Sequence, residues 1–473
     1  MILPIEARCL YPEVEKMPRG ELEALQLKKL KYQLEYVCRR SSFYRDLYNK
    51  AGVHPRDIQR LEDIKLLPTV TKQDLLREQK ENPPYGRGLC IDPTEICMTI
   101  LTSGTSGIGQ ETYAMSRTDM EFSGSAWAVW LHRAGIVRGD VLMLTWPLGT
   151  NSGPQAAFLG ALKVGANAFP IGMYDSETKI NTYLNRFNPA ALLATPSYLT
   201  HLSILYQEKG IDPKETTPNL KAIFLGTESY PLSWAIEMEN FWGTRLHDLY
   251  GSTQQGAMAG CTCEFGAVVS GGRGFIHLDE VSTLYEFLDR ETGEPVGPGE
   301  EGELVMTNLN REGSPLIRFR SDDRVTYRHY TECRCGRTSR SLVPGAIARY
   351  DDMIKIKSQN IWPEAVDEVV FGHKEVEEYN GSVIVDERGR ERVMLKIEFR
   401  KTTTMAVEER KSLLQKLAAA LKVKTGVSME IEEVPYGTLK RYLFKTRRWA
   451  DERRKGLEAV KSVLSESKEQ KVG

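Results

Sequence analysis

The sequence predicts an α/β protein with a large N-terminal part and a small α+β C-terminal part. Short apolar runs at 140–145, 190–194 and 222–225 alternate with helical stretches such as 154–164. Alternation of this kind favours a sheet of parallel strands with helices packed on it. From residue 302 the pattern changes to strand-rich pieces, so we expect a β-rich portion after the parallel sheet.

The elements before the first buried strand are a helical region and two short strands. Residues 20–50 carry leucines at roughly helical spacing among Lys and Glu, which predicts helix. Residues 95–101 and 112–115 are rich in β-formers and predict strands on either side of a Gly/Ser/Thr loop.

A charged segment near Arg349, ARYDDMIKIK, interrupts the apolar pattern and predicts a domain boundary. We therefore expect an N-terminal domain over 1–348, a hinge over 349–352 and a C-terminal domain over 353–473. The last of these has its own signals: strands at 383–385 and 393–399, and a helix at 408–421. The charged tail beyond Trp449 predicts a solvated helix.

Composition limits the classes of partner. The chain has 473 residues, of which 41% are hydrophobic, and 63 basic residues against 64 acidic ones give a net charge of -1. That balance gives no general electrostatic reason to bind nucleic acid or an acidic membrane. The N-terminal residues show no basic region followed by an apolar run, and no apolar stretch of about 18 residues occurs. We expect a cytoplasmic protein without signal peptide or membrane span.

The segment 102–110, TSGTSGIGQ, is the first chemical signal. Glycines let the backbone approach an anion closely, and hydroxyls and amide N–H groups can then surround phosphate oxygens. No Gly-Lys-Ser/Thr follows, so it is not a Walker loop. A flexible surface turn is the alternative interpretation of the composition alone.

Four of the 8 cysteines form two C-x-C pairs, Cys261 with Cys263 and Cys333 with Cys335. Two such pairs, with His277 nearby in sequence, can converge on one tetrahedral ion as Cys₄ or Cys₃His. Thiolates select Zn²⁺ or an iron–sulfur cluster over hard cations. Four reduced, buried thiols are the alternative. A catalytic thiol is not expected, because no nearby base is evident.

Several segments together resemble the adenylate-forming superfamily of acyl-CoA synthetases, and within it the phenylacetate–CoA ligase branch. The successive matching segments are LTSGTSGIGQETY, ATPSYL, LGTESY, YGSTQQG, RFRSDD, RYDDMIKIKSQNIWP and GTLKRYLFKTRRWAD. The resemblance covers nearly the whole chain. It implies a large adenylate-forming domain with a mobile C-terminal lid domain. It also implies an ATP-dependent ligase that makes an acyl-adenylate and then an acyl-CoA thioester.

The resemblance implies a role for each matching residue. Asp323 would accept bonds from the ribose hydroxyls, and Arg349 would contact ribose or phosphate. Lys445 would neutralise charge on the α-phosphate and the attacking carboxylate in the first half-reaction, and Asp351 would be the hinge. The other implied nucleotide-binding residues are Thr102, Ser103, Gly104, Thr105, Ser106 and Gly107 at the phosphates, Gly226, Thr227 and Glu228 beside the adenine, and Tyr250, Gly251, Ser252 and Thr253 along it. Related ligases carry a Cys/His zinc site in corresponding segments, with His277 at the matching place.

Three positions depart from the family pattern. Ile108 stands where the phosphate loop commonly has a Lys, so one cation near the pyrophosphate is missing. Gln254 stands where a Glu commonly helps to hold Mg²⁺, and a neutral amide is a weaker ligand for a hard cation. Leu443 and Phe444 replace a small polar pair close to Lys445.

The implied cofactors are ATP, Mg²⁺ and coenzyme A, with a structural Zn²⁺, and the implied partner is a small carboxylic acid; a homodimer is left open. Residues 146–153, 194–198 and Gly226 should line the acyl site, and their small and aromatic side chains suit an aryl or arylacetic acid such as phenylacetate, or equally a medium aliphatic acid. Two other functions remain as alternatives. One is an adenylyltransferase acting on a non-carboxylate group such as a phenol on a cofactor, and the other is a non-catalytic homologue.

Overall fold

The chain folds into two units in the computed structural model. The described residues are 8–102, 109–256, 259–356, 359–386, 390–401, 403–440 and 448–453. The first unit comprises Met1–Thr227 and Ile236–Asp351, and the second comprises Glu228–Ala235 and Asp352–Gly473. The sequence pattern predicts a single division of the chain, so it does not anticipate that residues 228–235 group with the second unit.

The first unit contains a parallel sheet, as expected from the apolar runs. Its strands lie in the order β7-β6-β5-β3-β4, and each neighbouring pair is parallel. Every residue of β5 and β6 is buried, which fits strands covered by helices on both faces. The strand bounds are β3 (Val141–Leu144), β4 (Asn167–Pro170), β5 (Ala191–Ala194), β6 (Ala222–Leu225) and β7 (Arg245–Tyr250).

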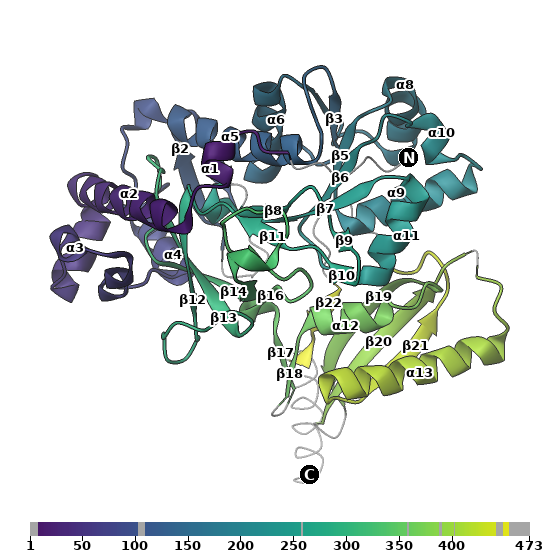
Figure 1. Cartoon of the computed structure of the whole chain (residues 1–473). Coiled ribbons are helices and arrows are strands. Elements are labelled where there is room, and N and C mark those ends of the chain that lie inside the picture. Colours follow the sequence, from purple (N-terminus) through teal and green to yellow (C-terminus); the bar gives the residue numbers. More distant parts are fainter. Residues whose placement is uncertain are drawn as a thin grey trace, which may run out of the picture. The chain divides into compact units, whose positions relative to one another are not determined.

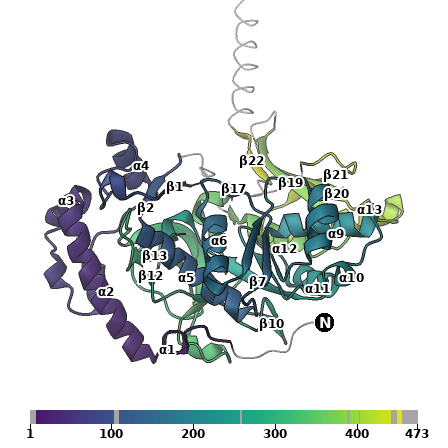
Figure 2. The ribbon, with the colours of Figure 1, turned by 90° about the horizontal axis from the view of Figure 1, so that it is seen from above.

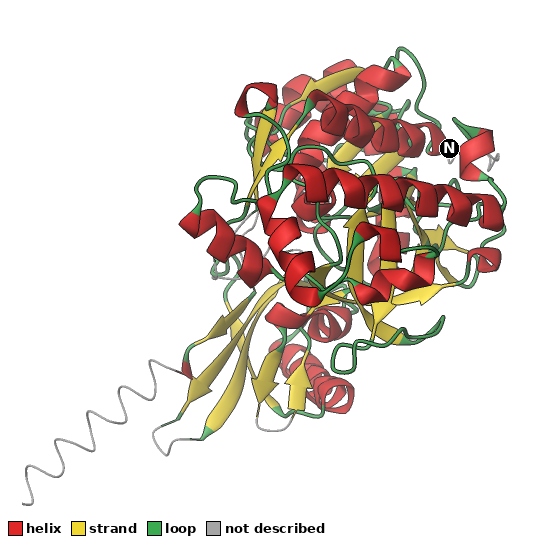
Figure 3. Ribbon diagram, turned by 90° about the vertical axis from the view of Figure 1, so that its left-hand side faces the viewer, coloured by secondary structure: helices red, strands yellow, loops and turns green. Residues whose placement is uncertain are grey.

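Helices connect and cover these strands (Figure 3). Ser116 and Asp119 form a capping box at the start of α5, which satisfies two of the free N–H groups there. The helices α5 and α6 touch closely, because a Cβ on Gly160 would lie 2.4 Å from Cβ of Trp127. Only glycine fits at this crossing. The helix bounds are α5 (Arg117–Arg133), α6 (Ser152–Val164), α7 (Ser176–Thr178), α8 (Asn185–Phe187), α9 (Pro196–Glu208), α10 (Pro213–Thr216) and α11 (Leu232–Trp242).

The same sheet continues beyond β7 as an antiparallel, β-rich portion, so that 12 strands form one sheet (Figure 1). The order continues from β7 through β8, β11, β15, β14 and β13 to β12, and β16 pairs with β14. Two short strands, β9 (Val268–Val269) and β10 (Gly272–Arg273), form a hairpin. The other bounds are β8 (Gly260–Thr262), β11 (Ile276–Leu278), β12 (Thr283–Leu288), β13 (Glu301–Asn308), β14 (Phe319–Arg328), β15 (Ser341–Leu342) and β16 (Ala348–Arg349).

The N-terminal helices pack beside β12 and β13 (Figures 1 and 2). The expected helix over 20–50 is two helices, α2 (Arg19–Arg40) and α3 (Ser42–Ala51). They are separated at Ser41, whose extended backbone ends one helix and whose hydroxyl accepts the Tyr44 N–H of the next. The remaining elements here are α1 (Pro12–Glu15), α4 (Lys72–Glu81) and the antiparallel strands β1 (Met98–Leu101) and β2 (Thr112–Met115).

The second unit is α+β, with a four-stranded sheet in the order β21-β20-β19-β22. Its core joins apolar residues of the sheet to those of α12 and α13. The predicted solvated helix beyond Trp449 falls largely on residues 454–473, which lie outside the described residues. Residues Trp449–Asp451 form β22, where the indole ring packs against Gly381 and its N–H donates to the Tyr379 hydroxyl at 3.2 Å. The bounds are β17 (Ile354–Ile356), β18 (Gln359–Ile361), α12 (Pro363–Val370), β19 (Val376–Val385), β20 (Glu391–Phe399), α13 (Val407–Thr425) and β21 (Met429–Val434).

No helix within the described ranges is long and apolar enough to cross a bilayer.

Candidate functional site

The expected site segments follow the carboxyl ends of the parallel strands. Strands β3, β5, β6 and β7 end at Leu144, Ala194, Leu225 and Tyr250. The residues of the acyl and adenine segments come directly after them. Because the carboxyl ends of parallel strands meet at one edge of a sheet, this edge is where a ligand is expected to bind.

Two residues close the base of the predicted phosphate loop. Thr102 and Glu111 pair through their backbones, with Thr102 N–H donating to the Glu111 carbonyl at 3.0 Å. Glu111 N–H donates in turn to Oγ1 of Thr102 at 2.9 Å. Leu101 N–H donates to the Thr150 carbonyl, which ties this base to the predicted acyl segment. Ser103, Gly104, Thr105, Ser106, Gly107 and Ile108 lie outside the described residues.

Asp323 on β14, Tyr250 at the end of β7 and Arg349 on β16 come together in the first unit. Tyr250 donates its hydroxyl to Oδ2 of Asp323 at 2.5 Å. Asp323 lies directly opposite Arg349 in the pairing of β14 with β16, and Arg349 Nε is 3.8 Å from Oδ1 of Asp323. The arrangement places an acid, a phenol and a guanidinium beside one another.

A bulge in β14 sets the position of Asp323. The register between β13 and β14 shifts between Glu303 and Val305, and Asp322 takes a left-handed φ of 60°. Such a backbone is uncommon for a residue other than glycine. Arg290 forms an ion pair with the Asp322 carboxylate at 2.9 Å, and the Ser321 hydroxyl accepts the Asp323 N–H at 3.1 Å. These contacts hold the strained turn.

Burial raises the pKa of Asp323, while the Arg349 charge and the Tyr250 hydrogen bond act in the opposite direction. The net direction is upward, because a charged carboxylate loses its water on burial.

Arg349 also contacts the predicted hinge. Its Nε donates to Oδ1 of Asp351 at 2.8 Å and its Nη2 donates to Oδ2 at 3.2 Å. This is a two-point contact between a guanidinium and a carboxylate. The contact joins the last residue of β16 to the 3-10 turn Tyr350–Asp352 that follows it.

Trp146 packs over Gly226 in the predicted acyl site. A Cβ on Gly226 would lie 3.3 Å from Cη2 of Trp146 and 3.5 Å from Cβ of Leu249. The next residue, Thr227, has a left-handed φ of 75°. Strained backbone of this kind clusters at functional sites. Glu228, which the sequence predicts beside the adenine together with Thr227, belongs to the second unit.

The segment after β7 turns sharply. Ser252 precedes the 3-10 turn Thr253–Gln255, and Gly256 ends it with a φ of 77°. Gly251 is exposed. Gln254 donates its side-chain amide to Oε1 of Glu111 at 2.8 Å.

The sequence interpretation misses Glu111, Lys72 and Arg311. Arg311 donates to the Gln254 carbonyl at 2.8 Å, and Lys72 Nζ lies 3.8 Å from Oε2 of Glu111. The signal that could have found Glu111 is a single acid among the β-formers of QETYAM. Nothing in the pattern points to the other two. Lys445, Leu443 and Phe444 lie outside the described residues.

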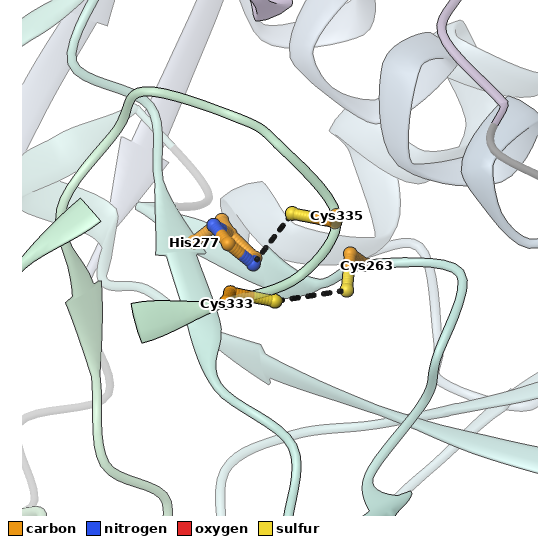
Figure 4. A group of neighbouring side chains, drawn as sticks. All are labelled: Cys263, His277, Cys333 and Cys335. Carbon is orange, nitrogen blue, oxygen red and sulfur yellow. Dashed lines mark hydrogen bonds between the residues drawn. The ribbon is translucent and has the colours of Figure 1, made fainter. Parts of the chain in front are cut away.

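Four of the five predicted metal ligands converge (Figure 4). The ligand atoms of Cys263, His277, Cys333 and Cys335 all lie within 4.8 Å of one another. The Cys263 and Cys333 sulfurs are 3.9 Å apart, and the Cys335 sulfur is 3.5 Å from Nε2 of His277. Sulfurs on one tetrahedral Zn²⁺, with Zn–S near 2.3 Å, would be about 3.8 Å apart. Three soft sulfurs and one imidazole nitrogen therefore fit zinc.

Cys261 is not in this group of four. It lies on β8, buried, and burial raises the pKa of its thiol to about 12. Hydrogen bonds from Cys263 and Cys333, and then the contact with His277, lower the pKa of Cys335. A thiolate at Cys335 is the form that binds a metal.

A buried ion-pair network supports the cluster. Arg337, two residues after Cys335, binds Glu264 at 2.5 Å and Glu15 at 2.9 Å. Arg133 binds the same Glu15 oxygen at 2.8 Å. Burial raises the pKa of Glu15, but Arg133 and Arg337 outweigh it and the net pKa is lowered. Arg133 and Arg337 favour the charged form of Glu15, which joins α1 to the loop that carries Cys333 and Cys335.

The family models match both units. The AMP-binding enzyme model matches residues 25–310, and the AMP-binding enzyme C-terminal domain model matches residues 358–453. The first covers more than half of the chain. The chain belongs to the AMP-binding enzyme family.

Relatives of this AMP-binding enzyme span nearly its whole length. A phenylacetate-coenzyme A ligase of Thermus thermophilus is 28% identical over 444 residues, covering 90% of this chain and 95% of the relative. The phenylacetate-coenzyme A ligase of Escherichia coli is 27% identical over 438 residues, covering 90% and 94%. A solved structure of 2-hydroxyisobutyryl-CoA ligase with 2-HIB-AMP has a TM-score of 0.85 at 25% identity and covers 98% of this chain and 97% of that one.

These comparisons confirm the predicted family and the α/β fold class. The prediction that the enzyme class is an AMP-forming acid–thiol ligase is confirmed. The acid, the acyl acceptor, the metals and the roles of single residues belong to the proposal that follows.

Proposed function

We propose that the protein is an ATP-dependent carboxylate–CoA ligase acting on an aryl or arylacetic acid such as phenylacetate. In the first step a carboxylate oxygen attacks the α-phosphorus of ATP, and pyrophosphate leaves. In the second the sulfur of coenzyme A attacks the acyl carbonyl, its thiol proton passes to solvent, and AMP leaves. The observation that carries the proposal is the Tyr250–Asp323–Arg349 arrangement.

The nucleotide site is assigned by combining this geometry with the family motifs. Asp323 accepts the ribose hydroxyls, and Arg349 contacts ribose or phosphate. Tyr250, Gly251, Ser252 and Thr253 run along the adenine, with Gly226, Thr227 and Glu228 on its other side. Thr102 and residues 103–107 surround the phosphates. Lys445 stabilises charge in the first step, where loss of one such donor costs about 10²–10³ in rate.

The acid is assigned from the lining of the acyl site. Residues 146–153 and 194–198 supply the rings of Trp146 and Tyr198, and the Trp146 ring packs directly over Gly226. Aromatic side chains of this kind suit a flat aromatic acid. The phenylacetate-coenzyme A ligases that match 90% of the chain support the arylacetic class, and the 2-hydroxyisobutyryl-CoA ligase structure makes an aliphatic acid the alternative.

Two metals complete the proposal. Mg²⁺ accompanies ATP, neutralising charge on its phosphate oxygens. Zn²⁺ is structural and is held by Cys263, His277, Cys333 and Cys335, since a closed tetrahedral set leaves no open position for substrate.

The deciding experiment is a pyrophosphate-release screen over aryl and aliphatic acids, with and without coenzyme A. The proposal expects release that depends on an aryl acid, and AMP release that depends on coenzyme A. An adenylylated phenol formed without coenzyme A would instead establish the adenylyltransferase alternative, and no release with any acid would favour a non-catalytic homologue.

Lys445→Ala tests whether Lys445 acts only in acyl-adenylate formation. It should abolish acyl-adenylate formation and leave thioester formation from preformed acyl-adenylate largely intact, because Lys445 acts only in the first step. Equal loss of both steps would count against its assignment.

A further inference from the structure

Two buried acids lie opposite each other in the sheet of the second unit. Glu378 on β19 pairs directly with Glu398 on β20, and the two residues are 4% and 0% exposed. Like charges directly opposite on neighbouring strands are destabilising, and a buried charge costs free energy unless it is paired. Each carboxylate therefore needs a partner from elsewhere in the chain.

The partners of both acids lie on either side of Lys445 in the sequence. Oε2 of Glu398 accepts the backbone N–H of Leu439 at 2.9 Å. Glu378 accepts two hydrogen bonds from the Arg448 guanidinium, from Nε to Oε1 at 2.6 Å and from Nη2 to Oε2 at 3.3 Å. Lys445 itself lies outside the described residues. The two acids thus anchor the chain before and after the stretch that carries Lys445.

Several further contacts hold Arg448 in place. Its side chain is 10% exposed, and its Cζ lies 4.6 Å from the centre of the Phe371 ring, within the range of a cation–π contact. Nη1 is 3.8 Å from Oδ1 of Asp367, and the Arg448 carbonyl accepts the Gly381 N–H at 2.8 Å. Burial lowers the pKa of Arg448, but the charges of Asp367 and Glu378 outweigh it and the net pKa is raised. The guanidinium therefore stays charged.

We propose that the Glu378–Arg448 ion pair positions Lys445 for acyl-adenylate formation. This rests on the proposed function, in which Lys445 stabilises charge in the first step. Lys445 precedes Arg448 by three residues and follows Leu439 by six. Three residues span at most about 11 Å and six about 22 Å, so the fixed backbone of Arg448 restricts Lys445 more tightly than Leu439 does. Arg448 and Glu378 are positioning residues, because they act through Lys445.

The competing explanation is that the ion pair only stabilises the second unit. Arg448 directly precedes β22, which pairs with β19, so loss of the ion pair would loosen that strand and do nothing more. A purely structural role predicts that the two half-reactions slow down together, or that neither slows while the protein is folded. A positioning role predicts a loss confined to the first half-reaction.

Single-turnover rates of the two half-reactions in the full-length protein test the inference. The first is pyrophosphate release from ATP with the best acid of the screen above, and the second is thioester formation from the preformed acyl-adenylate. Glu378→Gln should slow the first about 10-fold and Arg448→Met about 100-fold, because a misplacement near 1 Å costs about that much. Both variants should keep the second rate, and the KM for ATP, within about 3-fold of wild type.

Two further variants separate positioning from folding. Arg448→Lys keeps the charge but loses the two-point contact, so its adenylation rate should lie between those of Arg448→Met and wild type. Leu417→Ala removes a fully buried side chain from the core of the same unit. It should lower the melting temperature and keep both half-reaction rates within about 3-fold of wild type. If Arg448→Met does not fold, Glu378→Gln and Arg448→Lys decide the result.

The same measurements separate this inference from the proposed function. An unchanged adenylation rate in Glu378→Gln and Arg448→Lys, or an equal loss in both half-reactions, would overturn the inference and leave the proposed ligase standing. Wild-type protein that releases no pyrophosphate with any acid would overturn both.

Discussion

Tyr250 and Asp323 share a buried hydrogen bond of 2.5 Å across strands β7 and β14. The two strands are not neighbours in the sheet, since β8, β11 and β15 lie between them. The phenol therefore reaches the carboxylate over the sheet, and the contact joins the end of β7 to the bulge in β14.

Tyr250→Phe should weaken AMP binding about 10-fold, or ~1.4 kcal/mol. In the proposed site Asp323 accepts ribose hydroxyls most strongly as a charged carboxylate, and burial raises its pKa, so AMP affinity should fall as the pH drops through that raised pKa. The mutation removes a hydrogen bond that lowers this pKa, so the fall should begin at a higher pH. Calorimetry with AMP from about pH 8 down to about pH 5 measures both effects.

Tyr206→Phe is the matched control for that experiment. Tyr206 is also buried and donates to the side chain of Asn185 at 2.8 Å, away from Asp323. It should leave AMP affinity and its pH dependence unchanged. If Tyr250→Phe behaves like Tyr206→Phe, the contact with Asp323 plays no part in nucleotide binding.

Asp351→Pro should leave adenylation measurable and slow thioester formation by more than about 10-fold, or ~1.4 kcal/mol of barrier. Proline fixes φ near -65°, and we propose that the backbone at this hinge must change between the two steps. Asp351→Ala removes the same ion pair with Arg349 without fixing φ, so it separates the two effects. If Asp351→Pro and Asp351→Ala form the thioester at equal rates, the hinge does not lie at residue 351.

Purified protein should carry about one equivalent of zinc. Cys335→Ser should lose the metal and lower the melting temperature, because an ion that binds only the folded state stabilises it. Cys261→Ser, at the thiol outside the group of four, should keep both the metal and the melting temperature. Elemental analysis that finds neither zinc nor iron would disprove the site, and iron in place of zinc would indicate a cluster.

Gly226→Val should raise the KM for an aryl acid by about 10-fold. A Cβ at position 226 would lie 3.3 Å from the Trp146 ring, and the two methyl groups of valine would clash with that ring. Combining it with Trp146→Phe removes the ring atom that the valine meets and should recover most of the loss. Steady-state kinetics on both variants decide it: a double variant no better than Gly226→Val would show that the two residues do not share the acyl site.

Local pattern was enough to predict much of the fold. Strands 112–115 and 222–225 match β2 and β6, because buried apolar runs next to glycine loops leave few alternatives. The break at Ser41 was missed, because one residue in a long helical pattern changes little in the periodicity. The short strand at Trp449–Asp451 was not predicted, because the contact that holds Trp449 is with Tyr379, 70 residues away.

The site divides in the same way. The residues within motifs, such as Asp323 and Arg349, could be named from the sequence, and the structure pairs those two across β14 and β16. The choice between His277 and Cys261 in the cysteine group could not be made, because it depends on side-chain directions across β8 and β11. The contact between Glu111 and Gln254 could not be predicted, because the two residues are 143 positions apart in the chain.

The ion pairs of Glu15 with Arg133 and Arg337 tie the first helix to the loop that carries Cys333 and Cys335. A shortened protein that starts after Glu15 would bury Arg133 and Arg337 without the carboxylate they share, and breaking a buried pair costs about 3–5 kcal/mol. Fusion tags should therefore join upstream of Pro12. Any attempt to graft residues 333–337 into a related ligase would have to transplant α1 along with them.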